Sequence, residues 1–127
     1  CDNVVDHAES PKRIVSELAR ILVPGGLLYF TVNVHHRVYA IAAGVHASWR
    51  AVGIPLEIGP FADHTTHLTL EAAEDLFQNL PLQILSAKSN VDEARARARQ
   101  QPPRHAGDRL KRLFFKNALY EVIARRA

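Results

Sequence analysis

The residues best suited to chemistry are histidines in two short clusters. His35 and His36 directly follow an apolar run, and His64 and His67 lie in the sequence DHTTH. Imidazole has an ordinary pKa of about 6.5, so much of it is unprotonated at neutral pH and can take a proton from an O–H or N–H nucleophile. The pattern predicts His35 and His36 as candidate general bases. A polar helix start in contact with water is the structural alternative.

The second cluster raises the question of a metal. His64 and His67 are three residues apart, and a site shared with His35 or His36 would supply enough nitrogen ligands. However, residues 54–68 contain two prolines and a glycine, which is typical of a long irregular loop rather than a helix that would align the ligands. Such loops often contact substrates, so substrate binding is favoured and no metal is predicted.

A capped helix and a buried strand must position the first cluster. Ser10 suits the N-cap of a helix over residues 11–23, because its hydroxyl can accept a hydrogen bond from an amide of the first turn. The Pro-Gly-Gly sequence at 24–26 ends that helix and reverses the chain. The nearly continuous apolar run that follows, within residues 27–34, suits a strand covered on both faces. This favours a parallel α/β sheet.

The remaining segments alternate between helices and strands. Apolar residues recur at helical spacing over 38–52 and 69–80, so helices are expected there. Residues 82–87 and 118–124 are rich in strand formers. Alanine and arginine alternate within residues 90–101, which could form a solvated helix.

Two aromatic residues of the 38–52 helix allow more than one interpretation. Tyr39 and Trp49 could each stack on a substrate. Trp49 falls in the apolar stripe of that helix, so packing in the core or at an interface is favoured for it.

Composition limits the class of protein. The 127 residues make one domain, and 47% hydrophobic and 23% charged residues are ordinary for a globular protein. The single cysteine excludes an internal disulfide, and no apolar run reaches the length of a membrane span, so a cytoplasmic protein that does not act at membranes is expected.

Positive charge is concentrated towards the C-terminus. Ten of the sixteen lysines and arginines lie between Arg95 and Arg126, and we treat residues 90–117 as a basic insert. Such a tract could bind nucleic acid without catalysis, but apart from Phe114 and Phe115 it lacks interleaved aromatic residues. A solvated surface insert is therefore favoured.

Two motifs, together with the order of elements, resemble a known family. The sequences NVVDH at residues 3–7 and SELARILVPGG at 16–26 are similar to the loop after the fourth strand and the segment before the fifth strand of class I S-adenosylmethionine-dependent methyltransferases. The stretch 67–71, HLTLE, is a looser match to a later helix of that family. The resemblance implies the C-terminal half of a Rossmann-like doubly wound sheet, mostly parallel with an antiparallel last strand.

The same resemblance implies methyl transfer from S-adenosylmethionine to an unidentified small molecule. Structural roles compete with this interpretation: Asp6 could complement the positive end of the following helix, and His7 could be a structural hydrogen bonder. The resemblance places the cofactor against Cys1, Asp2, Asn3 and His7, and the substrate beyond the strand end at Asn33. Tyr39, His64 and His67 are further candidates for substrate binding, from their positions in the following helix and the long loop.

One departure from the family is large. The glycine-rich turn after the first strand and the acid after the second have no counterpart, and Gly25-Gly26 cannot replace them because it follows a helix and enters a strand. We therefore expect residues 1–127 to be a partial methyltransferase domain without its N-terminal cofactor-binding half, inactive alone. Such a chain would self-associate through the sheet edge left exposed.

Overall fold

The structure, a computed structural model, describes residues 5, 8–54, 67–102, 114–115 and 117–127. The predicted helices and strands form in the predicted order, although the helix expected over 69–80 is shorter. None of the helices within the described ranges is long and apolar enough to cross a membrane. The elements are α1 (Pro11–Ile21), β1 (Leu27–Val34), α2 (Arg37–Ala51), α3 (Leu70–Asp75), β2 (Leu82–Ser89), α4 (Val91–Gln100) and β3 (Ala118–Arg126).

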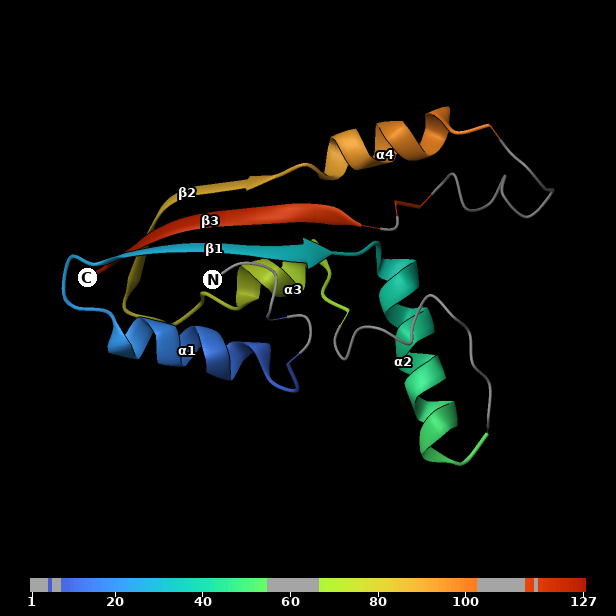
Figure 1. The fold of residues 1–127 in the computed structure, drawn as a ribbon, viewed down its shortest axis with the longest axis horizontal. Coiled ribbons are helices and arrows are strands. Elements are labelled where there is room, and N and C mark those ends of the chain that lie inside the picture. The colour runs from blue at the N-terminus through green and yellow to red at the C-terminus, as the bar shows by residue number, and fades with distance from the viewer. Residues whose placement is uncertain (1–4, 6–7, 55–66, 103–113, 116) are drawn as a thin grey trace.

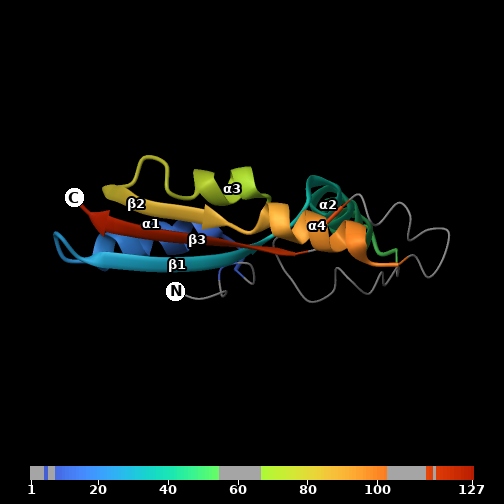
Figure 2. The same cartoon turned by 90° about the horizontal axis from the view of Figure 1, so that it is seen from above.

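The three strands form one sheet in the order β1-β3-β2 (Figure 2). β3 runs antiparallel to both neighbours, and its first residue, Ala118, lies opposite Val34 at the end of β1. Tyr120 lies opposite Ser89 at the end of β2. The carboxyl ends of β1 and β2 therefore meet the start of β3 at one end of the sheet.

The prediction of a mostly parallel, Rossmann-like doubly wound sheet is wrong. Both strand pairs in the described part of the chain are antiparallel, and only the direction of the last strand agrees with the prediction. The apolar run of β1 indicated burial, but burial does not fix the direction of a neighbour. Leu27 and Tyr29 are in fact 60% and 52% exposed, so one face of β1 opens to solvent at its start, as antiparallel sheets allow.

The core lies on the other face of the sheet. Alternate residues of β1 point into it, and α1 and α3 lie along this side of the strands (Figure 1). Phe30 is fully buried and meets Phe77 edge-on, with ring centroids 5.2 Å apart. The same core holds Val15 from α1 and Ala73 from α3. Its strand residues are Leu28, Phe30, Val32, Val34, Ala118, Tyr120, Val122 and Ala124.

The two ends of α1 are stabilised differently. Ser10 occupies the N-cap position as predicted, but its side chain makes no capping hydrogen bond. The start of the helix is therefore favoured by Pro11, whose fixed φ suits the first helical position. At the other end, the Arg126 guanidinium donates to the carbonyls of Arg20, at 2.7 Å, and Leu22. The last strand thus satisfies carbonyls that the end of a helix leaves without intrahelical partners.

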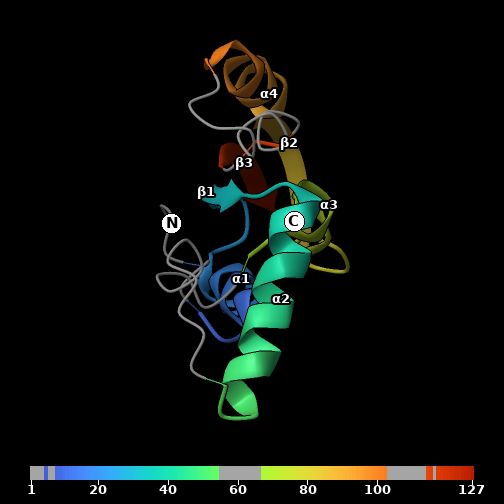
Figure 3. The same cartoon turned by 90° about the vertical axis from the view of Figure 1, so that its right-hand side faces the viewer.

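α2 begins directly after β1 and leads away from the sheet (Figures 1 and 3). Its only buried residue is His46, and none of its apolar side chains belongs to the core. Trp49 is 41% exposed, so packing of this residue in the core, one of the two expected environments, is not found.

Candidate functional site

The candidate site is a group of imidazole, phenyl and guanidinium side chains at the carboxyl ends of β1 and β2. His35 and His36 follow β1 directly. Phe114 and Phe115 precede β3, which starts beside the end of β1, and Arg95 comes from α4, which starts after β2 (Figure 1). Because β3 enters between the other strands, residues almost 80 positions apart in the sequence meet here. We call these five residues the strand-end cluster.

His35 is one of two buried members of the cluster, the other being Phe115. His35 is 5% exposed, and its backbone N–H donates to the carbonyl of Leu68 at 2.8 Å. This hydrogen bond ties the end of β1 to the segment before α3, and it brings the ring of His67 to a centroid distance of 5.0 Å from the His35 ring. The structure therefore brings together two of the predicted site residues, one from each histidine cluster.

His36 is the N-cap of α2. Its Nδ1 accepts a hydrogen bond from the backbone N–H of Val38 at 3.2 Å, so the neutral ring carries its proton on Nε2. The ring packs against Phe114 and Phe115, at centroid distances of 4.8 and 5.5 Å. In this state His36 has a hydrogen to donate at Nε2, while its only lone pair is already engaged.

Two causes keep His36 neutral. Partial burial of the ring is the larger, and the positive charge of Arg95 is the second; both lower the pKa of His36 below its ordinary value of 6.5. Arg95 also lies over the Phe115 ring, with its guanidinium carbon 5.9 Å from the ring centroid. The cluster thus favours an uncharged imidazole beside a fixed positive charge.

The lowered pKa of His36 predicts a dependence of stability on pH. As the pH falls below about 6.5, the unfolded chain binds a proton at His36 before the folded chain does, so the free energy of unfolding falls until the pH has passed the folded-state pKa. Protonation also removes the acceptor of the Val38 amide. We expect urea midpoints to fall between about pH 7 and pH 5, and to fall less in His36→Asn, whose side chain can still cap the helix. Equal falls in both proteins would contradict the assignment.

Two other predicted substrate residues flank the cluster. Asn33 is half-buried near the end of β1, opposite Leu119 of β3. Tyr39 is half-buried in the first turn of α2, where its backbone N–H donates to the carbonyl of His36 at 2.8 Å. Both residues are therefore close to His36 in the sequence. The ring of His36, however, packs against the rings of Phe114 and Phe115.

Several predicted site residues lie outside the described part of the chain. These are the cofactor residues Cys1, Asp2, Asn3 and His7 and the substrate residue His64. Among the residues that are described, no three His, Cys, Asp or Glu side chains are placed to hold a metal ion.

The sequence interpretation missed three members of the strand-end cluster and its support. Phe114, Phe115 and Arg95 were considered only as parts of a basic tract, because nothing local shows that they meet β1. Asn90 supports the site: its Oδ1 accepts from the Leu119 N–H at 2.7 Å, and its own N–H donates to the Leu119 carbonyl at 3.1 Å. An asparagine directly between a strand and a helix is the only signal that could have indicated this role.

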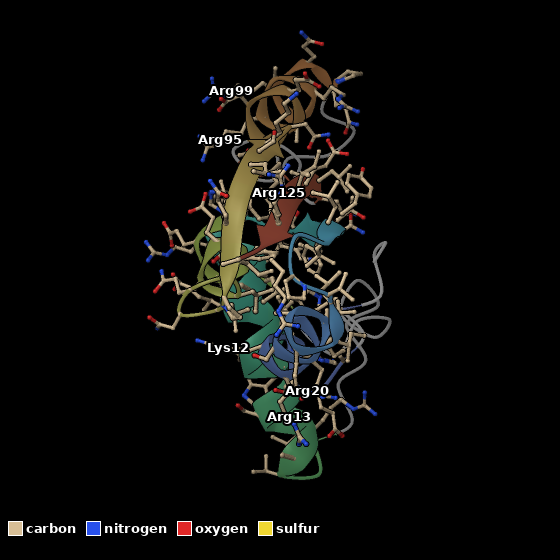
Figure 4. All side chains as sticks on the ribbon, turned by 90° about the vertical axis from the view of Figure 1, so that its left-hand side faces the viewer. Lys12, Arg13, Arg20, Arg95, Arg99 and Arg125 are labelled. Carbon is tan, nitrogen blue, oxygen red and sulfur yellow. The ribbon has the colours of Figure 1, made fainter. Side chains whose placement is uncertain are left out.

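The described basic side chains are distributed over several elements. Those labelled in Figure 4 belong to α1, β3 and α4, and α1 and α4 lie at different ends of the molecule (Figure 1). Ion pairs also neutralise part of α4, with Arg95 3.9 Å from Asp92 and Arg97 3.7 Å from Glu93. Binding of nucleic acid by the chain is tested directly by a binding titration against salt.

No protein-family model and no curated protein matches this chain. Its sequence motifs and the strand-end cluster are therefore what indicates a function.

Proposed function

We propose that this chain is the acceptor-binding part of an S-adenosylmethionine-dependent methyltransferase that acts on a small molecule. The proposal combines the sequence resemblance of residues 3–7 and 16–26 with one structural observation. That observation is the strand-end cluster, which lies directly after β1, where the resemblance implies that an acceptor binds.

The described residues do not by themselves form a cradle for the cofactor. Their Pro-Gly-Gly turn joins α1 to β1, and a Cβ on Gly26 would lie 2.8 Å from the Val23 carbonyl oxygen of the same turn. This close approach serves the turn rather than a ligand. By resemblance the cofactor would contact Cys1, Asp2, Asn3 and His7, which lie outside the described residues, so we derive only how the acceptor is held.

The cluster suits positioning better than proton removal. When bound, S-adenosylmethionine would supply an activated sulfonium methyl group to the acceptor lone pair, sulfur would keep the electrons of the bond it loses, and the acceptor proton would pass to water. Correct placement can lower the barrier of such a transfer without a protein base. In our proposal, His36 Nε2–H donates to a polar group of the acceptor and Phe114 contacts its apolar part. His35 is buried, so it supports His67 and the turn into α2.

The first test is the reading frame upstream of Cys1. A glycine-rich turn between a strand and a helix, encoded before Cys1, is the expected result, because such a turn approaches the cofactor. A frame that starts at or near Cys1, with no other chain supplying that turn, would end the catalytic proposal.

The second test measures the role of His36 in the full protein with methyl-labelled S-adenosylmethionine and a panel of small acceptors. His36→Asn keeps the cap of α2 but removes the ring, so we expect KM for the acceptor to rise about tenfold while kcat changes less than about threefold. Thr69→Asn, which exchanges the cap of α3 in the same way, should leave both constants unchanged.

The outcomes separate the parts of the proposal. A loss of kcat in His36→Asn together with a changed acid limb of the pH profile would make His36 a base and overturn its positioning role. Absence of methyl transfer to any acceptor by a wild-type protein that binds the cofactor would overturn the function itself.

A further inference from the structure

An apolar stripe runs along α2 to its C-cap, and the core of the described residues leaves it unused. Its members are spaced by three or four residues and therefore lie on one side of the helix. Each is at least two-fifths exposed, even though this spacing is typical of a packed helix face. The stripe consists of Val38 (43% exposed), Ile41 (64%), Val45 (44%), Trp49 (41%) and Val52 (72%).

α2 needs a partner to account for its order. It has 15 residues, a length at which an isolated helix is only marginally stable in water, and helices usually gain most of their stability from packing of an apolar face. Its start is fixed by the His36 cap and by the ion pair between Arg37 and Glu71 at 3.5 Å. Beyond this first turn, none of the described elements holds the stripe in the core, and each of its members is at least 41% exposed.

The spacing of the stripe is symmetric about Val45. The other members lie four and seven residues before and after it. In an antiparallel pair of α2 helices, Val45 therefore meets Val45 of the partner subunit. Ile41 then lies opposite Trp49 of the partner subunit, and Val38 lies opposite Val52 of the partner subunit. A surface that matches itself in this way is what a two-fold symmetric dimer requires.

We propose that α2 is the dimer interface of this chain and that its occupant is the α2 helix of a second copy. The stripe extends about 21 Å along the helix, and a paired stripe with its neighbouring residues buries on the order of 1,000 Å², near the lower limit for a specific interface. A reversible dimer with a micromolar dissociation constant is therefore expected. This differs from the association through the sheet edge left open by missing strands that the sequence predicted.

Sedimentation equilibrium of the 127-residue chain tests the dimer. The wild type should pass from monomer to dimer between low micromolar and several hundred micromolar protein, while the emission of Trp49, the only tryptophan, shifts to shorter wavelength. Ile41→Glu should weaken association at least about tenfold, because a carboxylate would be buried against Trp49 of the partner subunit. Ile21→Glu is the matched control: Ile21 ends α1, is also 64% exposed, and should leave association unchanged.

Crosslinking tests the antiparallel arrangement without depending on a destabilised variant. In a Cys1→Ser background, Val45→Cys should form a disulfide-linked dimer on mild oxidation. Val38→Cys, at a position of almost equal exposure, should not, because the two sites would lie about 21 Å apart. A monomer at all concentrations, association that persists in Ile41→Glu, or efficient crosslinking through Val38→Cys would each overturn the proposal.

Discussion

Phe30→Ala is expected to lower the free energy of unfolding by about 3–5 kcal/mol, the usual cost of removing a fully buried aromatic ring. Phe30 lies in β1, its side chain is completely buried, and its ring meets Phe77 edge-on at 5.2 Å. The residue opposite, Val122 of β3, is 1% exposed. The ring therefore joins the strands to the segment after α3, and its removal leaves a cavity between them.

Urea denaturation followed by far-ultraviolet circular dichroism measures this loss. Leu27→Ala is the control, because Leu27 lies in the same strand but is 60% exposed, and the change should stay within about 0.5–1 kcal/mol. If Phe30→Ala does not fold, Phe30→Leu gives a smaller loss at the same position. Equal losses at positions 27 and 30 would show that the buried face of β1 has been assigned incorrectly.

The secondary structure could be predicted from sequence because its signals are local. Pro11, the Pro-Gly-Gly turn and Thr69 all mark element ends correctly; Thr69 caps α3 through a 3.2 Å hydrogen bond from the Ala72 N–H. The predicted burial of Leu76 and Phe77 is confirmed, although both lie beyond the end of α3 at Asp75 and not inside the helix. These features depend on residues within one or two turns of each other.

The sheet topology could not be predicted in the same way. An apolar strand such as β1 can pair with a parallel or an antiparallel neighbour. The direction of that neighbour depends on the end of the sheet at which the chain enters β3. β3 is separated from β1 by 83 residues and pairs with it along its whole length. Similarly, the period of α2 correctly indicated an apolar stripe, but a period does not reveal what covers it.

The candidate site was predictable only in part for the same reason. His35 and His36 were found because they directly follow an apolar strand, and ligand sites tend to lie beyond strand ends. The contact of His36 with Phe114 and the charge of Arg95 beside it depend on the return of the chain into β3. The change in the expected chemistry of His36 from proton acceptor to hydrogen-bond donor has a local cause, because the Val38 N–H occupies Nδ1.

Two glycine-to-alanine substitutions should change stability in opposite directions. At Gly26, a Cβ would lie 2.8 Å from the Val23 carbonyl oxygen, which also accepts the Gly26 N–H at 2.8 Å. The turn cannot move freely, because the Gly26 carbonyl also accepts the Arg126 N–H at 2.9 Å. Gly26→Ala must therefore displace backbone, and a loss of about 1–3 kcal/mol is expected.

Gly44→Ala is the matched substitution with the opposite sign. Gly44 lies inside α2, nothing approaches its Cβ position within 4 Å, and alanine is favoured over glycine in a helix interior by about 1 kcal/mol. Urea midpoints, measured at a protein concentration low enough to keep the chain monomeric, should fall for Gly26→Ala and rise for Gly44→Ala. Because both changes add one methyl group to a glycine, opposite shifts would trace the loss to the closely packed turn between α1 and β1. A midpoint for Gly26→Ala at or above that of the wild type would show that this turn tolerates a side chain, and that its hydrogen bond with Arg126 does not hold it in place.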